Sequence, residues 1–336
     1  MFPRYKARIG DALRLRLPGD GYGAYHLLRY SMGWADAEGN AIVATEGKAL
    51  RPTLCLFACE AAGGTLERAM PAAVSLELVH NFSLIHDDVQ DRDETRHHRP
   101  TVWATWGDAK ALVAGNVMNL VADASLAELV QKSVSFEDAN RVAGLLTQAY
   151  LEMIEGQYLD LSYEGRSDVG MRAYLGMISK KTGALFRCAL NVGALLGGAD
   201  PSTVKAFDEC GRHLGFAFQI RDDVLGIWGD GVATGKPVGA DVRRKKNSLP
   251  IVYAMAKARG TDASLLKTVY SSETIDDEAV DSVLQTMDRL EVKEYTEDLV
   301  AEHCDATLST LDDVKLSPED RKDIEELCHF LSVRQH

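Results

Sequence analysis

Apolar residues recur along most of the chain at the three- and four-residue spacing of an amphipathic helix. Alanine and leucine are abundant in these segments, whereas alternating β-branched runs and Asn-Gly hairpin pairs are scarce. The pattern predicts helices over residues 48–62, 69–92, 107–131, 137–160, 170–198, 201–230, 248–259, 277–290 and 293–312. We therefore expect an all-α protein of about ten helices.

Short glycine-rich breaks separate the predicted helices, and the longest of them is GDGVATGKPVGAD at residues 229–241. No internal repeat, low-complexity segment or long linker divides the 336 residues. A wholly helical chain of this length can bury one continuous core. We expect a single domain.

The composition excludes several classes of function. A formal net charge of −13 argues against general nucleic-acid binding and against attachment to anionic lipid through charge. The longest apolar runs fall short of the roughly 20 residues of a membrane span, and the N-terminus lacks the apolar segment of a signal peptide. The six cysteines show no paired metal spacing. We expect a cytoplasmic protein with reduced thiols, no integral membrane segment and no nucleic-acid partner.

The stretch HDDVQD, a DDxxD pattern, ends one of the predicted helices. Asp87 and Asp91 are four residues apart and share a helix face, where their charges repel each other and oppose the helix dipole. A compensating cation would offset this cost, and carboxylate oxygens with a diphosphate are typical ligands of Mg²⁺. Taken alone, the pattern is as easily a solvated helix end.

A second acidic pair, Asp222 and Asp223, ends another apolar helix, with Gln219 one turn earlier. Carboxylate pairs at the ends of two largely buried helices are unusual for solvated surface residues. Together the two pairs could hold a metal–diphosphate unit. Basic residues near breaks or helix ends could reach the phosphates. They are Lys48, Arg51, Arg96, Lys181, Lys236 and Lys246.

These segments occur in the order and at the spacing of one family. The sequence resembles the trans-isoprenyl diphosphate synthases (polyprenyl synthetases) of the geranylgeranyl or farnesyl type, from about residue 25 to the C-terminal helices. The resemblance is carried by GKALRP, ELVHNFSLIHDDVQD, RPT, KTGALF, FQIRDDVLGIWGD, TGKPVGAD and KKNSLP. It implies one isoprenoid synthase domain: residues 25–336 form mostly antiparallel helices around a central cavity, residues 1–24 form an N-terminal extension or helix, and the chain forms a homodimer.

The resemblance also implies an activity, the Mg²⁺-dependent head-to-tail condensation of an allylic diphosphate with isopentenyl diphosphate. Mg²⁺ would be held by Asp87, Asp91 and Asp222, with Asp88 and Asp223 behind them or as alternate ligands. Positive charge on the allylic diphosphate would come from Arg96, Lys181, Lys236 and Lys246. The diphosphate of isopentenyl diphosphate would be bound by Lys48, Arg51, His80 and the region of His97. The allylic cation would be stabilised by Thr182 and Gln219.

The helix before the first acidic cluster is expected to set product length. Phe82 lies five residues before Asp87, about 7.5 Å further along the helix axis. In the enzymes that the sequence resembles, a bulky residue at this depth stops chain growth, and a phenylalanine here is typical of twenty-carbon products. We expect geranylgeranyl diphosphate first and farnesyl diphosphate next. The alternative is that Phe82 is simply a core residue of an apolar helix.

The sequence departs from the family pattern at two points. His97 and His98 follow Arg96, where the family commonly has a second arginine that binds isopentenyl diphosphate. An imidazole of pKa about 6.5 is mostly neutral at pH 7 and cannot form a bidentate fork. Gly226 stands where many members carry a third aspartate in the second acidic motif.

Two other functions stay open at this point. A class I terpene cyclase ionises an allylic diphosphate on a similar helical scaffold without a second diphosphate site. The retained Lys48, Arg51 and His80 argue against it. A non-catalytic subunit that binds prenyl diphosphates is the other alternative, and the two intact acidic pairs argue against that function.

Overall fold

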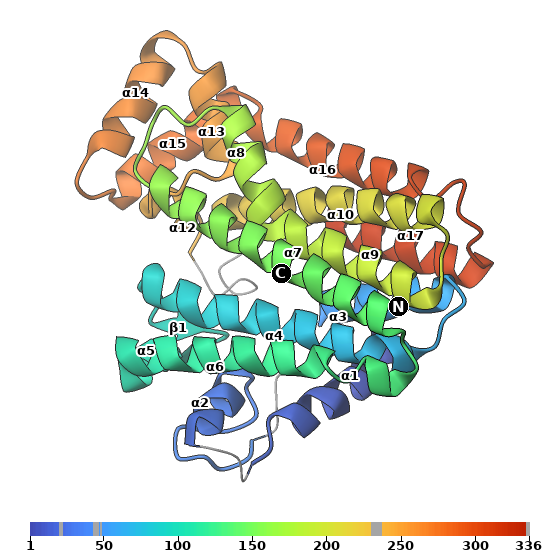
Figure 1. Cartoon of the computed structure of the whole chain (residues 1–336). Coiled ribbons are helices and arrows are strands. Elements are labelled where there is room, and N and C mark those ends of the chain that lie inside the picture. Colours follow the sequence, from blue (N-terminus) through green and yellow to red (C-terminus); the bar gives the residue numbers. More distant parts are fainter. Residues whose placement is uncertain (20–22, 43–46, 48, 230–236, 334–336) are drawn as a thin grey trace. The chain divides into compact units, whose positions relative to one another are not determined.

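The computed structural model describes residues 1–19, 23–42, 47, 49–229 and 237–333, and it divides into two compact units. Unit 1 comprises Met1–Tyr150, Leu185–Asp208 and Leu316–Asp320, and unit 2 comprises Leu151–Ala184, Glu209–Lys315 and the chain from Arg321 onward. The described elements are almost entirely helices (Figure 1), so the predicted all-α class is confirmed. The single domain stays a prediction.

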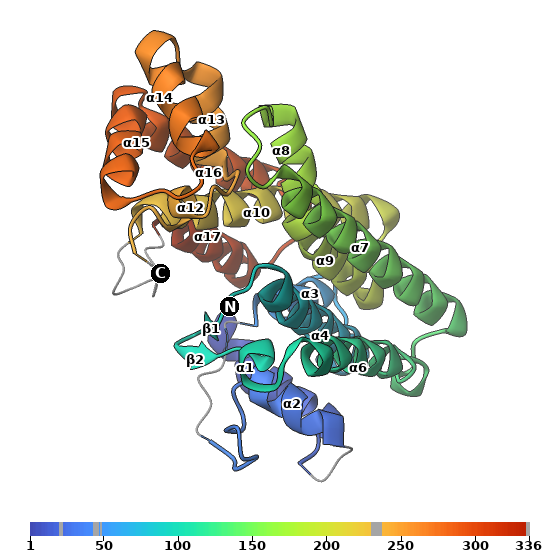
Figure 2. The ribbon, with the colours of Figure 1, turned by 90° about the vertical axis from the view of Figure 1, so that its left-hand side faces the viewer.

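Unit 1 is built on two helices that run side by side, α4 (Leu66–Gln90) and α6 (Asp108–Leu126) (Figures 1 and 2). Its other helical elements are α1 (Phe2–Arg16), α2 (Gly23–Ser31), α3 (Leu50–Ala61), α5 (Val102–Trp106) and the short η1 (Val130–Lys132). Ion pairs join α1 to its neighbours: Arg4 to Glu60 at 2.7 Å and Arg8 to Glu67 at 2.5 Å. The N-terminal segment is therefore an integral part of unit 1.

Helix α9 (Ala184–Gly197) packs against α3 through glycines. A Cβ on Gly193 would lie 2.2 Å from the carbonyl oxygen of Cys55, and one on Gly197 would lie 2.5 Å from Cβ of Ala62. Only glycine allows the two backbones to approach so closely. The buried Cys55 belongs to this contact, and all six cysteines are buried free thiols.

A short hairpin follows α4 and was not predicted. Strands β1 (Thr95–Arg96) and β2 (Arg99–Pro100) pair antiparallel, and His97 and His98 form the turn with φ of 50° and 60°. Two consecutive residues with positive φ are the signature of a type I′ hairpin turn, which asparagine and glycine normally occupy. Histidines in these positions carry no sequence signal for a turn.

Arg99 ties this hairpin to the N-terminal part of unit 1. Its guanidinium donates to the carbonyl oxygens of Tyr30 at 3.2 Å and Ala35 at 2.7 Å. It also lies over the ring of Tyr30, 4.4 Å from the centroid. Arg99 thus fixes strand β2 of the hairpin through contacts that do not involve the turn residues His97 and His98.

Unit 2 contains a helix interrupted by a π-helical turn, together with a group of C-terminal helices. The interrupted helix consists of α8 (Met171–Ile178) followed by η2 (Ser179–Gly183), which leads into α9. The other helices are α12 (Ala240–Arg243), α13 (Leu249–Lys257), α14 (Gly260–Ser271), α15 (Asp277–Arg289) and α16 (Val292–Ser309). Their buried core includes Ile227, Val242, Ile251, Val283 and Met287. Helices α7 (Phe136–Tyr163), α10 (Pro201–Trp228) and α17 (Pro318–Val333) each contribute residues to both units.

Among the described residues, one helical segment is long and apolar enough to cross a membrane by length and composition alone. It runs over Asp108–Lys132, with a mean hydropathy of 1.2, and 39% of its apolar window is buried. A core helix passes the same test, and α6, which forms most of this segment, packs along α4. The segment is therefore weak support for a membrane span.

Candidate functional site

The first acidic cluster lies at the C-terminal end of α4. Asp91 follows the last helical residue, and its N–H donates to the carbonyl oxygen of Asp87 at 2.7 Å, which closes the final turn. Asp88 is only 5% exposed. Its Oδ1 accepts from Nε of Arg96 at 2.8 Å, and Nη2 of the same guanidinium forms an ion pair with this oxygen at 2.8 Å. Asp87 and Asp91 are thus one turn apart, and both are more exposed than Asp88.

Asp88 and Arg96 form a charge pair inside the cluster. Burial raises the pKa of Asp88, while its hydrogen bond and ion pair with Arg96 oppose that rise. Arg96 therefore contacts a protein carboxylate in this structure. Its guanidinium has five donors, so donors beyond those that Asp88 engages can also bind an anion.

His97 lies at the tip of the hairpin next to Arg96. Burial lowers the pKa of His97, and the neighbouring Arg96 and His98 lower it further. The imidazole is therefore neutral at pH 7 and contributes no charge to this side of the site.

Arg51 and His80 lie in unit 1, on α3 and α4. Arg51 is 9% exposed, and its guanidinium carbon lies 5.0 Å from the ring centroid of Phe186. Burial lowers the pKa of His80 well below its usual value, and Arg51 and Arg96 lower it further. His80 is a neutral hydrogen-bonding group here.

Glu77 was missed by the sequence interpretation. It is buried on α4, one turn before Asn81, whose amide donates to its Oε1 at 3.3 Å. Burial raises the pKa of Glu77, and the charge of Arg51 opposes that rise. A carboxylate within reach of the Arg51 charge could be foreseen only by knowing that α3 and α4 are neighbours.

Phe82 is buried on α4, with 6% of its surface exposed. Its ring meets the ring of His86 edge to face, with centroids 5.6 Å apart. It occupies the depth below Asp87 that the sequence predicted for a product-length floor, and its burial is equally that of a core residue.

The second acidic cluster has the same organisation as the first. Asp223 on α10 is 2% exposed. Its Oδ2 accepts from the backbone N–H of Leu249 at 2.7 Å and from the hydroxyl of Tyr174, and its Oδ1 accepts from Nε2 of Gln219 at 3.0 Å. Burial raises the pKa of Asp223 to about 6, against the opposing charge of Lys246. The neighbouring Asp222 is only partly buried.

Gln219 and Thr182 extend this network. Because the amide nitrogen of Gln219 donates to Asp223, its Oε1 faces the hydroxyl of Thr182, which donates to it at 2.5 Å. Thr182 belongs to the π-helical turn η2, and turns of this kind occur frequently at functional sites. No sequence pattern distinguishes a π turn from the helix around it.

Lys181, also in η2, is fixed by an unpredicted partner. Its Nζ lies 2.5 Å from Oδ2 of Asp160, a residue of α7 that is 8% exposed. Burial would raise the pKa of Asp160, but the charges of Lys181 and Lys246 outweigh it and lower the pKa. A Cβ on Gly156 would lie 2.2 Å from the backbone nitrogen of Lys181, so this glycine makes room for the π turn.

Gly226 on α10 lies against a further carboxylate. A Cβ at this position would be 2.3 Å from Oδ2 of Asp241, which is 8% exposed on α12. Asp241 also raises the pKa of Asp223. The space that a third aspartate side chain would need at position 226 is thus occupied by Asp241, a residue of the TGKPVGAD segment that the sequence interpretation passed over.

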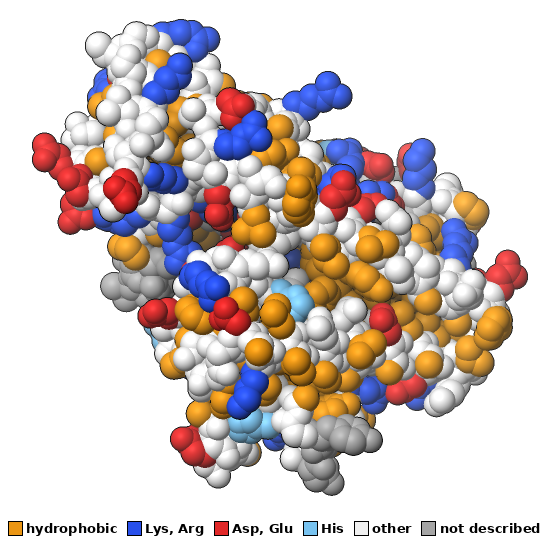
Figure 3. All heavy atoms as spheres, turned by 60° about the vertical axis from the view of Figure 1, so that its left-hand side comes forward, with side chains coloured by type: hydrophobic (Ala, Val, Ile, Leu, Met, Phe, Trp, Pro, Cys, Tyr) orange, Lys and Arg blue, Asp and Glu red, His pale blue; other side chains and the backbone are white. Residues whose placement is uncertain are grey.

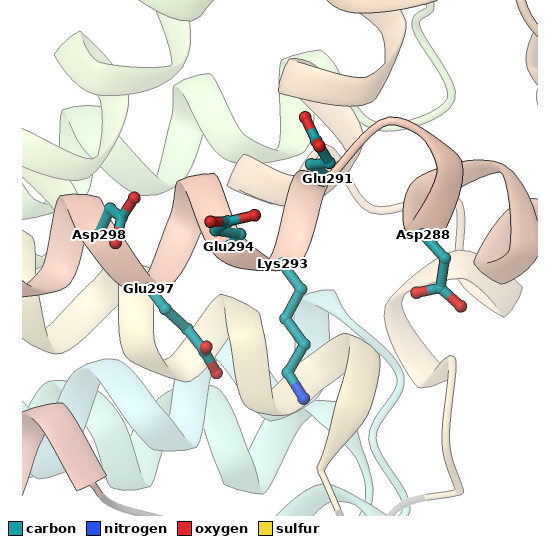
Figure 4. A pocket seen from close by; sticks show the side chains of 6 residues that line it. All are labelled: Asp288, Glu291, Lys293, Glu294, Glu297 and Asp298. Atoms are coloured by element: carbon teal, nitrogen blue, oxygen red, sulfur yellow. The ribbon is translucent and has the colours of Figure 1, made fainter.

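Unit 2 also has a surface hollow of about 380 Å³ on α15 and α16, shown in Figure 4. It is lined by Asp288, Glu291, Lys293, Glu294, Glu297 and Asp298. Five carboxylates around one lysine repel a diphosphate, and every residue that lines the hollow has a charged side chain. None of the predicted site residues contributes to it.

Lys48 and Lys236 lie outside the described residues. Within the part of the chain that the structure describes, no three histidine, cysteine, aspartate or glutamate side chains form a ready metal cage. Mg²⁺ does not need one, because it usually takes one or two carboxylates and completes its shell with water and substrate phosphates. The more exposed aspartates of the two clusters fit that requirement.

The pattern of the family described as polyprenyl synthetase matches residues 33–287. The chain is 38% identical over 312 residues to a (2E,6E)-farnesyl diphosphate synthase of Mycobacterium tuberculosis, covering 92% of this chain and 86% of that protein. It is 40% identical over 243 residues to a geranylgeranyl diphosphate synthase of the same organism, covering 72% and 68%. A polyprenyl synthetase structure from Streptomyces coelicolor A3(2) matches with a TM-score of 0.90 at 36% identity, covering 98% of each chain.

Proposed function

The chain belongs to the polyprenyl synthetase family, and from that premise we propose that it is a prenyltransferase condensing an allylic diphosphate with isopentenyl diphosphate, head to tail. The observation that carries the proposal is the shared organisation of the two acidic clusters. In each, one aspartate is embedded in protein hydrogen bonds and its neighbour is more exposed. The relatives named as farnesyl and geranylgeranyl diphosphate synthases support a short-chain product.

We propose Asp87, Asp91 and Asp222 as the residues that hold Mg²⁺. When bound between these carboxylates, Mg²⁺ would supply Lewis-acid stabilisation of the negative charge on the departing diphosphate. Asp88 and Asp223 are proposed to support these ligands without necessarily binding the metal themselves. Asp88 orients Arg96, and Asp223 fixes the end of α10 through the backbone of α13.

The basic residues of unit 2 bind the allylic diphosphate. Asp160 holds the ammonium of Lys181 in place, and Lys246 lies near enough to lower the pKa of Asp160 and of Asp223. Arg96 and Lys236 are proposed to contribute to the same leaving group. Cations fixed before the reaction stabilise charge as it develops without reorganising.

Thr182 and Gln219 are proposed to stabilise the allylic cation with their oxygen dipoles. The Asp223 contact keeps the Gln219 amide from rotating, so its oxygen stays beside the Thr182 hydroxyl. Neither group is charged, and both are held by hydrogen bonds, which disfavours capture of the cation by these oxygens.

Isopentenyl diphosphate is proposed to bind through Lys48, Arg51 and His80. Arg51 supplies a guanidinium that Phe186 and Glu77 orient. His80 is neutral and can donate one hydrogen bond. His97 is proposed to take the place of the second arginine, and the diphosphate must raise its pKa before it contributes a charge.

Product length is proposed to be set by Phe82, with geranylgeranyl diphosphate favoured and farnesyl diphosphate next. Its buried ring on α4 supports this choice. Phe82→Ala is expected to lengthen the product, because the ring no longer blocks the space below the first acidic cluster.

A homodimer is proposed from apolar side chains that α6 and the segment after it leave exposed. Large hydrophobic residues are seen at the surface in Figure 3. The exposed large hydrophobic residues of α6 and the segment after it are Leu112, Val113, Leu120, Val130 and Phe136. Leu120 is 65% and Phe136 80% exposed, and an isolated chain rarely exposes so many large apolar groups along one segment. We also propose a cytoplasmic location, which the six free thiols support.

One assay tests the proposed function. The purified protein is incubated with Mg²⁺, each allylic diphosphate and labelled isopentenyl diphosphate. Label in a longer diphosphate is expected, and its loss in Asp222→Asn is expected alongside full activity in Asp298→Asn, an acid of the hollow in Figure 4. Hydrocarbon formed from the allylic substrate alone would instead identify a terpene cyclase. No turnover with any substrate would leave a binding subunit.

A further inference from the structure

The ring of Phe82 has one aromatic neighbour on its own helix. His86 lies one turn later on α4, and the two ring centroids are 5.6 Å apart with the planes at 87°. Edge-to-face pairs of this kind prefer one relative orientation and stabilise it beyond what burial alone contributes. The position of the Phe82 ring therefore depends on where the imidazole of His86 lies.

His86 is in turn seated on α6, the helix beside α4 (Figure 2). Its Nε2 lies 3.2 Å from the carbonyl oxygen of Leu112. A carbonyl oxygen only accepts, so Nε2 carries the proton and donates. The ring lies directly over Gly115, where a Cβ would be 2.2 Å from Nε2 and 2.3 Å from Cδ2. No side chain other than hydrogen leaves room for the imidazole in this position.

We infer that His86 and Gly115 are positioning residues for Phe82 and thereby set the length at which the prenyl chain stops growing. The inference rests on the proposed function, in which Phe82 closes the space below Asp87. With His86 seated over Gly115, the imidazole occupies the volume beside the Phe82 ring. Without the imidazole, the ring can turn into that volume and leave room for a further five-carbon unit.

The readout is the ratio of longer product to wild-type-length product, which does not depend on how much enzyme is folded. His86→Ala is expected to raise this ratio about threefold to tenfold, as the loss of one edge-to-face pair predicts. Gly115→Ala keeps the histidine but requires the imidazole to move by at least about 1 Å, and should raise the ratio too. Gly144→Ala adds the same methyl group to α7, where nothing lies within 4 Å, and should leave the ratio unchanged.

A double variant separates positioning from direct contact with the substrate. If His86 acts through Phe82, His86→Ala changes nothing further once Phe82→Ala is present. A further rise in the double variant would overturn the inference, because His86 would then contact the growing chain itself.

The outcome for Phe82 alone separates this inference from the proposed function. If Phe82→Ala lengthens the product while His86→Ala and Gly115→Ala do not, the positioning role of His86 and Gly115 is refuted. The role of Phe82 in limiting product length is then still supported. If Phe82→Ala has no effect on product length, the floor and its positioning residues both fail. Condensation with isopentenyl diphosphate by the same samples would still support the synthase.

Discussion

Lowering the pH from 7 to 5 should destabilise unit 2 through a pair of histidines, one on α10 and one on α16. Nδ1 of His213 lies 3.0 Å from Nδ1 of His303, and Nη2 of Arg212 lies 2.9 Å from Nε2 of His213. An arginine only donates, so Nε2 of His213 accepts and its proton lies on Nδ1. That proton is donated to His303, whose Nδ1 is the acceptor. Protonating His303 at Nδ1 breaks this hydrogen bond.

The size of the effect follows from the pKa of His303. Burial first, and then His213 and Arg212, lower this pKa to about 4, while an unfolded histidine titrates near 6.5. Between these values the unfolded chain binds more protons than the folded one, so stability falls as the pH falls. The gap corresponds to about 2 kcal/mol at pH 5, and because the imidazole is partly exposed we expect about 1 kcal/mol after solvent screening.

Urea unfolding at pH 7 and at pH 5 measures this difference. His303→Gln keeps an acceptor for His213 and cannot titrate, so its free energy of unfolding should fall by about 1 kcal/mol less than that of the wild type. His329→Gln makes the same exchange at an exposed position of α17 and should behave as the wild type does. Equal losses of stability in the wild type and in His303→Gln would refute the reasoning.

Four further predictions test the fold and the site. Gly193→Ala places a methyl group against a backbone oxygen of α3 and should lower the free energy of unfolding by at least about 2 kcal/mol in thermal or urea unfolding, whereas Gly144→Ala should not lower it. Asp160→Asn releases its lysine partner and should raise KM for the allylic diphosphate about tenfold in steady-state assays; an equal rise for isopentenyl diphosphate would contradict this role. His97→Arg should lower KM for isopentenyl diphosphate at pH 7 and at pH 8, because the lowered pKa of His97 leaves the wild-type side chain neutral there while a guanidinium is always charged; an unchanged KM at both pH values would argue against it. Leu120→Lys should halve the mass seen by sedimentation, and an unchanged mass would remove this surface from the proposed dimer.

Helical periodicity predicted the elements whose apolar faces are wide, such as α4 and α6. It did not predict α1 or α17, whose sequences are rich in charge. Ion pairs with residues distant in sequence, such as Arg8 with Glu67, help to hold α1 in place, and no local pattern reports such a partner. The hairpin was missed for a related reason: its two turn residues are histidines, and tertiary contacts from Arg99 impose the turn.

Motif spacing located the acidic and basic residues of the candidate site. It did not predict which of them are buried or which residues they bind. Which aspartate of each pair is buried depends on Arg96 in one case and on Tyr174 and the backbone of α13 in the other. The partner of Lys181 comes from α7, outside every motif. A resemblance in sequence therefore supplied the residue types, and only the packing of helices supplied their hydrogen-bond partners.

The hairpin has a consequence for enzyme engineering. Arg96 anchors one strand to Asp88, and Arg99 anchors the other to two backbone carbonyls of the N-terminal region. The two tip residues, His97 and His98, have left-handed backbone conformations and lie between these anchors. A combinatorial library confined to the two positions, weighted toward residues that tolerate positive φ, would vary the side chains proposed to meet the second substrate while the anchors on either side stay unchanged.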